Sequence, residues 1–205
     1  NSSKMSNNNK APILVTGCNG LAGYWLIEKL QQLGHKNIYG LDLSPHNIVA
    51  QKLSAANFFQ GDITDRSRLQ EVIAKTKPST IFHLAALMDD RYGQALIDKV
   101  NIEGTKNLLE IVLELKLLST KILIPGSSAV YGETGLELIQ ENTPTAPKTL
   151  YGNSKKAQEA LALDHFQKHG IQVYLPRVFN NTAPYENAQK VCSSLAKQVV
   201  EHKLG

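Results

Sequence analysis

Residues 13–23 read ILVTGCNGLAG, an apolar run followed by three glycines that open a helical pattern. The apolar run 13–15 is typical of a short buried strand. Gly17 would allow a tight strand-to-helix turn, Gly20 a close approach of the backbone to a phosphate, and Gly23 close packing of the helix on the sheet. The N–H groups at the start of such a helix attract phosphates. The stretch predicts a dinucleotide-binding turn, and the alternative is a tight loop with only a structural role.

Short apolar runs and helical patterns alternate through the rest of the chain. Strands are predicted at 13–15, 38–43, 57–60, 80–84, 121–124 and 172–175, and helices at 21–33, 65–76, 93–118, 151–169 and 188–202. Strands that alternate with helices of this length indicate βαβ units on a parallel sheet. We therefore predict an α/β fold, a doubly wound parallel sheet of the Rossmann kind.

The composition of the 205 residues is that of an ordinary globular protein, with 42% hydrophobic and 20% charged residues. The net charge of +4 is spread among acids and bases, so no nucleic-acid partner is predicted. No apolar run is long enough to span a bilayer, so no membrane association is predicted. Cys18 and Cys192 fit neither a disulfide framework nor a metal-ligand spacing. We therefore expect a cytoplasmic protein without a metal site.

A carboxylate at the end of the second predicted strand bears on the choice of cofactor. Asp42 lies 19 residues after Gly23, where an acid accepts hydrogen bonds from the adenosine ribose and repels a 2′-phosphate. NAD is therefore predicted, with NADP possible, and a capping or turn role for Asp42 is the alternative. Asp62 and Ile63 follow the third strand and are predicted to flank the adenine, unless Asp62 is only a capping residue.

Ser127, Tyr151 and Lys155 form the second group of residues with a chemical signature. Tyr151 and Lys155 are four residues apart and so share a helix face. An ammonium near a phenol lowers the pKa of the phenol, which can then take a proton from a secondary alcohol while hydride leaves, or give one to a ketone in the reverse direction. Ser127 follows the fifth strand, where its hydroxyl would hold the substrate oxygen. Taken alone, a Tyr and a Lys at this spacing are more often a surface pair, so the prediction depends on their place in the fold.

Seven blocks along the chain carry a family resemblance. They are TGCNGLAG at 16–23, GDIT at 61–64, HLAA at 83–86, NIEGT at 101–105, SSAVYG at 127–132, YGNSK at 151–155 and PRVFNNTAP at 176–184. In this order they resemble the extended short-chain dehydrogenases/reductases of the NAD-dependent epimerase/dehydratase family, which act on nucleotide sugars. The resemblance implies that Ser127, Tyr151 and Lys155 are catalytic and that the substrate is a nucleotide sugar.

The same resemblance implies the remaining site residues. Cofactor contacts are expected from Gly17, Asn19, Gly20, Leu21, Gly23, Asp42, Asp62, Ile63, Leu84, Ala85, Ala86, Asn101, Tyr151 and Lys155. Within that set, Lys155 is expected to bind the nicotinamide ribose. Substrate contacts are expected from Ser128 and Asn180.

Departures from the family pattern narrow the reaction. Sugar 4,6-dehydratases carry an acidic residue two positions after the catalytic Ser or Thr, and this chain has Ala129 there, so dehydration is not expected. The segment 176–184 is similar to that of reductases acting on GDP-4-keto-6-deoxymannose, although Ala183 replaces their usual Gly. We predict a GDP-linked 4-keto-6-deoxy sugar reductase. The alternatives are a nucleotide-sugar 4-epimerase and a non-catalytic dinucleotide-binding sensor.

The resemblance also suggests how the chain is organised. Residues 1–10 are expected to form a disordered leader, 11–180 the NAD-binding Rossmann domain, and 181–205 the start of a truncated substrate-binding domain. A homodimer is expected, because family members often pair the helices equivalent to 93–118 in a four-helix bundle.

Overall fold

The computed structural model describes residues 11–44, 53–135, 138–186 and 190–204, in which a parallel sheet has the strand order β3-β2-β1-β4-β5-β7. The strands are β1 (Ile13–Thr16), β2 (Ile38–Asp42), β3 (Phe58–Gln60), β4 (Thr80–His83), β5 (Lys121–Leu123) and β7 (Gln172–Tyr174). The strand order reverses direction between β1 and β4, and ligands bind at this point in doubly wound sheets. The predicted fold class is confirmed.

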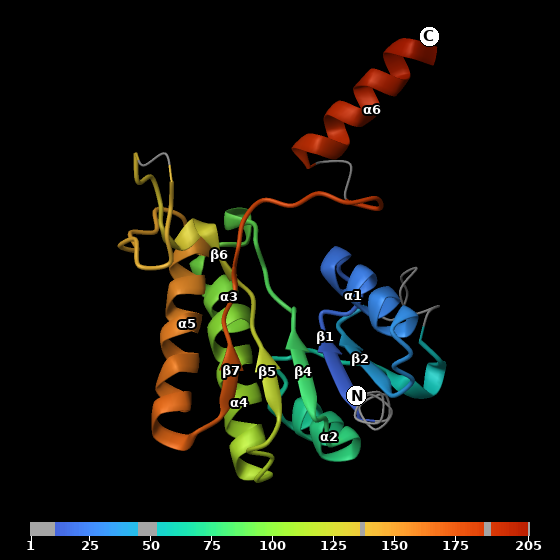
Figure 1. The fold of residues 1–205 in the computed structure, drawn as a ribbon, viewed down its shortest axis with the longest axis vertical. Helices are drawn as coiled ribbons and strands as arrows, with labels where there is room; N and C mark the ends of the chain where they lie inside the picture. Colours follow the sequence, from blue (N-terminus) through green and yellow to red (C-terminus); the bar gives the residue numbers. More distant parts are fainter. Residues whose placement is uncertain (1–10, 45–52, 136–137, 187–189, 205) are drawn as a thin grey trace, which may run out of the picture.

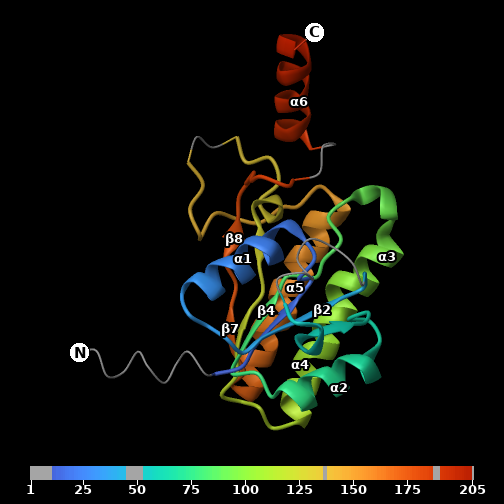
Figure 2. The ribbon, with the colours of Figure 1, turned by 90° about the vertical axis from the view of Figure 1, so that its right-hand side faces the viewer.

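Helices cover the two faces of the sheet unequally. The helices α2 (Arg66–Thr76), α4 (Gly104–Glu114) and α5 (Leu150–His169) lie on one face, and α1 (Leu21–Gln32) lies on the other (Figures 1 and 2). A π-helical turn, Lys99–Glu103, joins α3 (Gln94–Asp98) to α4 in one continuous helix. Single 3-10 turns lie at Ala55–Asn57, Asp90–Tyr92 and Ser128–Val130. Beyond the sheet, α6 (Val191–Leu204) projects away from the rest of the described chain (Figure 1).

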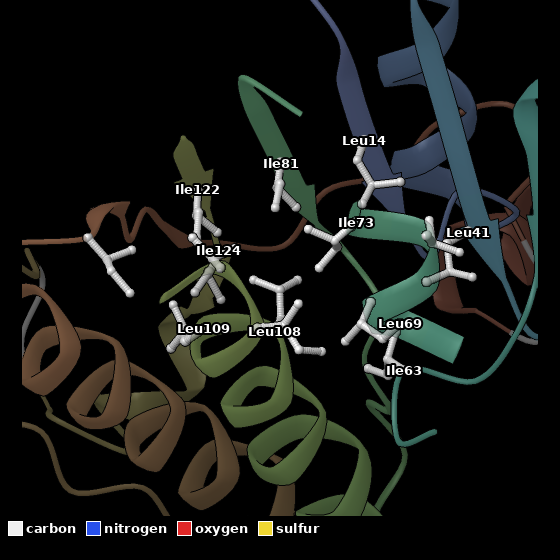
Figure 3. Packing of buried hydrophobic residues seen from close by; sticks show 14 of the residues in the cluster. Leu14, Leu41, Ile63, Leu69, Ile73, Ile81, Leu108, Leu109, Ile122 and Ile124 are labelled. Carbon is white, nitrogen blue, oxygen red and sulfur yellow. The ribbon is translucent and has the colours of Figure 1, made fainter. Parts of the chain in front are cut away.

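Alternate residues of β1 enter two different cores, as strand geometry requires. Leu14 belongs to the cluster that contains Ile73 of α2 and Leu108 of α4 (Figure 3). Val15 belongs to the cluster that contains Ile27 of α1. Because both faces of β1 are buried, residues 13–15 form an apolar run without polar alternation.

Capping residues set the ends of the predicted helices. Asp65 begins α2 by accepting a hydrogen bond from the Arg68 N–H at 3.0 Å. Thr149 begins α5 by accepting one from the Gly152 N–H at 2.9 Å. Helices begin readily after such side chains, because they satisfy N–H groups that have no partner within the helix. Both predicted helices are therefore confirmed to within a residue at their starts.

Other details differ from the sequence predictions. A second, two-stranded parallel sheet pairs β6 (Gly126–Ser127) with β8 (Arg177–Val178), and these strands are too short to give a periodic pattern. The helix predicted to continue to residue 118 ends at Glu114, since Lys116 adopts a left-handed conformation with φ +54°. The last helix was predicted from 188 and begins at Val191, and residues 188, 189 and the predicted leader 1–10 lie outside the described residues.

Within the described residues, no helix is long and apolar enough to cross a membrane. No three His, Cys, Asp or Glu side chains gather there in a way that would hold a metal ion.

Candidate active site

The glycine turn between β1 and α1 relies on backbone contacts that a side chain would prevent. Gly17 has φ +67°, and a Cβ at this position would lie 2.6 Å from the Ala85 nitrogen. A Cβ at Gly23 would lie 2.5 Å from the Cys18 carbonyl oxygen. Gly20 occupies the N-cap of α1 and has no side chain with which to cap the helix. The turn therefore presents a helix N-terminus that suits an anion such as a pyrophosphate.

Asp42, the last residue of β2, is bonded to this turn. Its carboxylate accepts hydrogen bonds from the Asn19 N–H at 2.9 Å and from the Ser44 N–H at 3.2 Å. The Asn19 amide donates in turn to the Ser44 carbonyl oxygen at 2.6 Å. Asp42 thus has the turn contacts that we considered as its alternative role. Each carboxylate oxygen accepts more than one hydrogen bond, so the same side chain can also accept from a ribose hydroxyl.

The segment after β4 lies directly beside the glycine turn. The Leu84 N–H donates to the Thr16 carbonyl oxygen at 3.0 Å, and Ala85 is the residue that a Cβ at Gly17 would meet. Ala86 continues the same segment, and Leu21 is the first residue of α1. These four predicted cofactor residues therefore lie around one turn.

The two residues predicted to flank an adenine differ in how deeply their side chains are buried. Asp62 is half-buried and accepts a hydrogen bond from the Thr64 N–H at 2.8 Å, which is a turn contact. Ile63 is 5% exposed and packs against Gly104 of α4 in the larger core. The side chain of Ile63 therefore belongs to the core.

Asn101, which we predicted to contact the cofactor, has a side chain that is bonded within the protein. Asn101 lies in the π-helical turn and is completely buried. Its amide accepts from the Leu87 N–H at 2.8 Å and donates to the Leu87 carbonyl and the Ser154 hydroxyl, both at 2.9 Å. These hydrogen bonds connect the segment after β4 to α5.

Ser127 and Tyr151 line the same cavity at the carboxyl edge of the sheet, and the Ser127 hydroxyl is close enough to Tyr151 to influence its pKa. Ser127 ends β6, and Tyr151 is the second residue of α5. Asp90 holds the start of that helix by accepting from the Tyr151 N–H at 2.9 Å and the Leu150 N–H at 3.1 Å. A carboxylate at a helix N-terminus is favourable, and this one fixes the backbone of Tyr151. The sequence gives no signal for Asp90, which comes from a distant loop.

Lys155 lies one helical turn beyond Tyr151 and is 4% exposed. Its ammonium donates to the Pro125 carbonyl and to Gln158 Oε1, both at 2.8 Å, and lies 5.9 Å from the centre of the Tyr151 ring. Burial lowers the pKa of Lys155 to about 8, and the nearby charge of Glu159 partly opposes this. The ammonium form still predominates at neutral pH.

The pKa of Tyr151 differs from our prediction. We expected the ammonium of Lys155 to lower it, whereas burial of the phenol raises it and the neighbouring Ser127 hydroxyl only partly opposes that rise. The donors of Lys155 go to Pro125 and Gln158 rather than to the phenol. Tyr151 is therefore protonated near neutral pH, as a proton donor must be.

A cavity of about 560 Å³ opens onto this pair of hydroxyl groups. Its lining consists of Met88, Asp89, Asp90, Ser127, Ser128, Ala129, Gly132, Thr149, Tyr151, Asn180 and Lys190. Both predicted substrate residues, Ser128 and Asn180, thus lie in the same cavity as Tyr151. Two carboxylates also lie here, but Asp89 is paired with Arg91 at 2.8 Å and Asp90 caps α5.

A mostly buried ion pair supports one side of the cavity and was not foreseen from the sequence. Arg177 of β8 binds the Glu159 carboxylate of α5, with two contacts of 2.9 Å. It also donates to the Tyr131 hydroxyl at 2.9 Å. The pair therefore joins α5 to the second sheet, which carries Ser127.

Comparison with known proteins agrees with this arrangement. The sequence model of the family described as GDP-mannose 4,6 dehydratase matches residues 14–205. A UDP-glucose 4-epimerase of Halalkalibacterium halodurans is 31% identical over 173 residues, which cover 82% of this chain and 50% of the relative. A GDP-6-deoxy-D-talose 4-dehydrogenase of Aggregatibacter actinomycetemcomitans is 28% identical over 165 residues, which cover 80% of this chain and 51% of the relative.

Solved structures lead to the same family. A dTDP-glucose 4,6-dehydratase of Bacillus anthracis, determined in complex with NAD, has a TM-score of 0.82 at 25% identity, with 94% of this chain and 62% of that chain covered. The chain spans about half the length of the curated relatives described above. The resemblance found in the sequence is confirmed: the chain belongs to the GDP-mannose 4,6 dehydratase family, within the NAD-dependent epimerases and dehydratases of nucleotide sugars.

Proposed function

We propose that the protein containing this chain is an NAD-dependent oxidoreductase of nucleotide sugars that uses Ser127, Tyr151 and Lys155. The observation that carries this proposal is that Ser127 and Tyr151 line one cavity, with the ammonium of Lys155 5.9 Å from the Tyr151 ring. The NAD complex of the Bacillus anthracis dehydratase supports the choice of cofactor.

The dinucleotide would be held by the groups around the first turn. The N-terminus of α1 would bind the pyrophosphate, and Asp42 would accept hydrogen bonds from the adenosine ribose. The carboxylate of Asp42 would repel a 2′-phosphate, so NAD is preferred to NADP. When bound, NAD supplies or accepts a hydride at its nicotinamide ring.

The residues of the cavity would move the proton. Ser127 holds the sugar oxygen by a hydrogen bond, and Tyr151 gives its proton to that oxygen when a ketone is reduced. The raised pKa of Tyr151 keeps the phenol protonated for this step. The ammonium of Lys155 favours the phenolate that remains, because opposite charges attract across a poorly solvated site.

Reduction of a GDP-linked 4-keto-6-deoxy sugar is the reaction that the site supports best. Ala129 lines the cavity at the position where dehydratases carry an acid, so the group needed to expel a hydroxyl is missing there. A relative named GDP-6-deoxy-D-talose 4-dehydrogenase, which is 28% identical to this chain, supports the assignment to a GDP-linked 6-deoxy sugar. The test is to supply GDP-4-keto-6-deoxymannose and NADH to the full protein and follow both. We expect one NADH to be oxidised for each sugar reduced.

A 4-epimerase is the second candidate, because a UDP-glucose 4-epimerase is 31% identical to this chain. An epimerase would convert UDP-glucose without added cofactor and without net oxidation of NADH. A non-catalytic sensor would bind NAD and convert neither sugar. The same pair of assays therefore separates the three possibilities.

We also propose that the protein is a homodimer. Leu163 and Phe166 lie three residues apart on α5 and are 45% and 51% exposed, and Leu96 of α3 is 43% exposed. These apolar side chains suit a helix-to-helix contact between two copies. Phe166→Glu is expected to convert the dimer to a monomer in sedimentation experiments, and an unchanged mass would contradict this contact.

A further inference from the structure

A chain of buried polar side chains runs from Lys155 through the protein to β1. Gln158 Nε2 lies 2.6 Å from Thr105 Oγ1, Thr105 Oγ1 lies 3.0 Å from His83 Nε2, and His83 Nδ1 lies 2.8 Å from Thr16 Oγ1. These four side chains come from α5, α4, β4 and β1, and none is more than 1% exposed. A buried polar network is stable only when each member is bonded, and it then fixes the positions of its members.

The proton positions along this chain follow from the acceptors. The Thr105 hydroxyl lies 2.7 Å from the Asn101 carbonyl oxygen and must donate to it. It therefore accepts from both Gln158 Nε2 and His83 Nε2, which must carry hydrogens. His83 Nδ1 is then the acceptor for the Thr16 hydroxyl. Burial lowers the pKa of His83 to about 3, so this neutral tautomer persists at physiological pH.

The same bonds fix the orientation of the Gln158 amide. Gln158 Nε2 donates to the Thr105 hydroxyl and lies 3.1 Å from the Asn101 carbonyl oxygen. The Oε1 atom therefore faces the ammonium of Lys155 at 2.8 Å. The reversed amide would set an NH₂ group against the ammonium and an oxygen against the carbonyl, so the observed orientation is the one that the contacts allow.

Several titratable groups surround the ammonium, and their roles can be distinguished. Glu159, on the same helix, is bonded to Arg177 of β8 through both carboxylate oxygens. Tyr151 presents its ring at 5.9 Å, and His83 reaches toward the site from β4 in its neutral form. The ammonium of Lys155 itself donates to two neutral oxygens, those of Pro125 and Gln158, and the latter is the one that a substitution can remove.

We propose that Gln158 is a positioning residue for Lys155: its amide oxygen holds the ammonium in place and stabilises the charge, leaving the third N–H to bind the cofactor. The inference rests on the proposed function, which assigns Lys155 to the nicotinamide ribose. It adds to that function the group that stabilises the charge of the buried Lys155 ammonium. Thr105 and His83 act one step further away, because they orient the Gln158 amide.

The test is the pH dependence of NAD affinity in the full protein, measured by calorimetry. In the unmutated protein the affinity should fall as pH rises, with a midpoint near 8, the pKa of Lys155. Gln158→Leu removes the acceptor and should move the midpoint down by about one pH unit, since the charged form loses a hydrogen bond. Gln158→Glu restores an acceptor with a negative charge and should move the midpoint up. If Gln158→Leu does not fold, the upward shift in Gln158→Glu decides the question.

A matched control separates positioning from general damage. Thr120 is buried and donates to the Pro78 carbonyl at 2.7 Å, away from the site. Thr120→Val should lower stability and leave the midpoint unchanged. Midpoints that stay near 8 in both Gln158 variants would overturn the role of Gln158 while leaving that of Lys155. An unmutated protein with no midpoint would instead remove the assignment of Lys155 to the cofactor, and the inference about Gln158 with it.

Discussion

The glycine turn and the cavity at Tyr151 lie at the same edge of one sheet, but different parts of the polypeptide build them. The turn is made of backbone: Gly17 and Gly23 bring chain segments closer than any side chain would allow. The proposed catalytic group is made of side chains from separate elements, which are bonded to Asp90, to Gln158 and to elements joined by the pair of Glu159 and Arg177.

This difference determines how each region should respond to substitution. A backbone site fails when an atom is added, because the close contact has no room to adjust. A side-chain site fails when an atom is removed, because a bonded partner is left without its hydrogen bond. Additions at the turn and deletions at the cavity should therefore have the largest effects.

Gly17→Val tests the backbone site and should have the largest effect. The added Cβ would lie 2.6 Å from the Ala85 nitrogen and would also force a branched residue into φ +67°. We expect NAD binding to fall below detection in calorimetry. Gly170→Val is the matched control, because Gly170 has φ +71° and open space around it. It should cost about 1–2 kcal/mol of stability from backbone strain and leave NAD affinity unchanged. Equal NAD affinity in the two variants would show that the close contact is not needed.

Tyr151→Phe tests the side-chain site by deleting one oxygen. Turnover should fall by roughly 10²–10⁴, the usual contribution of a positioned proton donor. Folding and NAD affinity should change little, because the ring still packs beside Lys155. Tyr174→Phe is the control, since Tyr174 is 51% exposed on β7 and outside the cavity lining. Retention of most activity by the Tyr151 variant would exclude it as the proton donor.

Asp42→Ala tests a side chain that binds the backbone of the glycine turn, so it combines features of both regions. The NAD dissociation constant should rise by about 10- to 100-fold, the equivalent of one or two hydrogen bonds to a charged group. Affinity for NADP should fall less, because the repulsion of its 2′-phosphate is also removed. Calorimetric titration with both dinucleotides gives the ratio. Tighter binding of NADP than of NAD by the unmutated protein would contradict the assignment.

The same contrast explains what the sequence could predict. The turn was predictable because close backbone contacts require glycine, and three glycines at fixed spacing are visible in one short stretch. Tyr151 and Lys155 were predictable because they share one helix. Asp90 and Gln158 were not, since their partners lie in other elements and nothing in the local pattern marks them. The internal bonds of Asn101 were hidden for a related reason, since nothing in the local pattern shows that its amide is bonded to Leu87 and Ser154.

The last prediction concerns the side-chain region alone, and it should have the smallest effect. Burial lowers the pKa of His83 from 6.5 to about 3. Between about pH 6.5 and about pH 3, His83 is protonated in the unfolded chain and neutral in the folded chain. The free energy of unfolding should therefore fall with falling pH in this window, by up to about 1.4 kcal/mol for each pH unit.

Replacing His83 by glutamine removes this titration. His83→Gln should be less stable than the unmutated protein at pH 7, because the buried hydrogen bonds of the His83 ring with Thr16 and Thr105 are disturbed. Between pH 7 and pH 5 the gap between the two proteins should narrow by about 1–2 kcal/mol, since only the unmutated protein loses the contribution of His83. Urea unfolding at a series of pH values measures the gap, and the carboxylates that both proteins share cancel in the difference. His202→Gln is the control, because His202 is exposed and should give parallel curves. Parallel curves for His83→Gln as well would mean that His83 binds protons equally in the folded and unfolded protein, and the persistence of its neutral form in the buried chain would then be wrong.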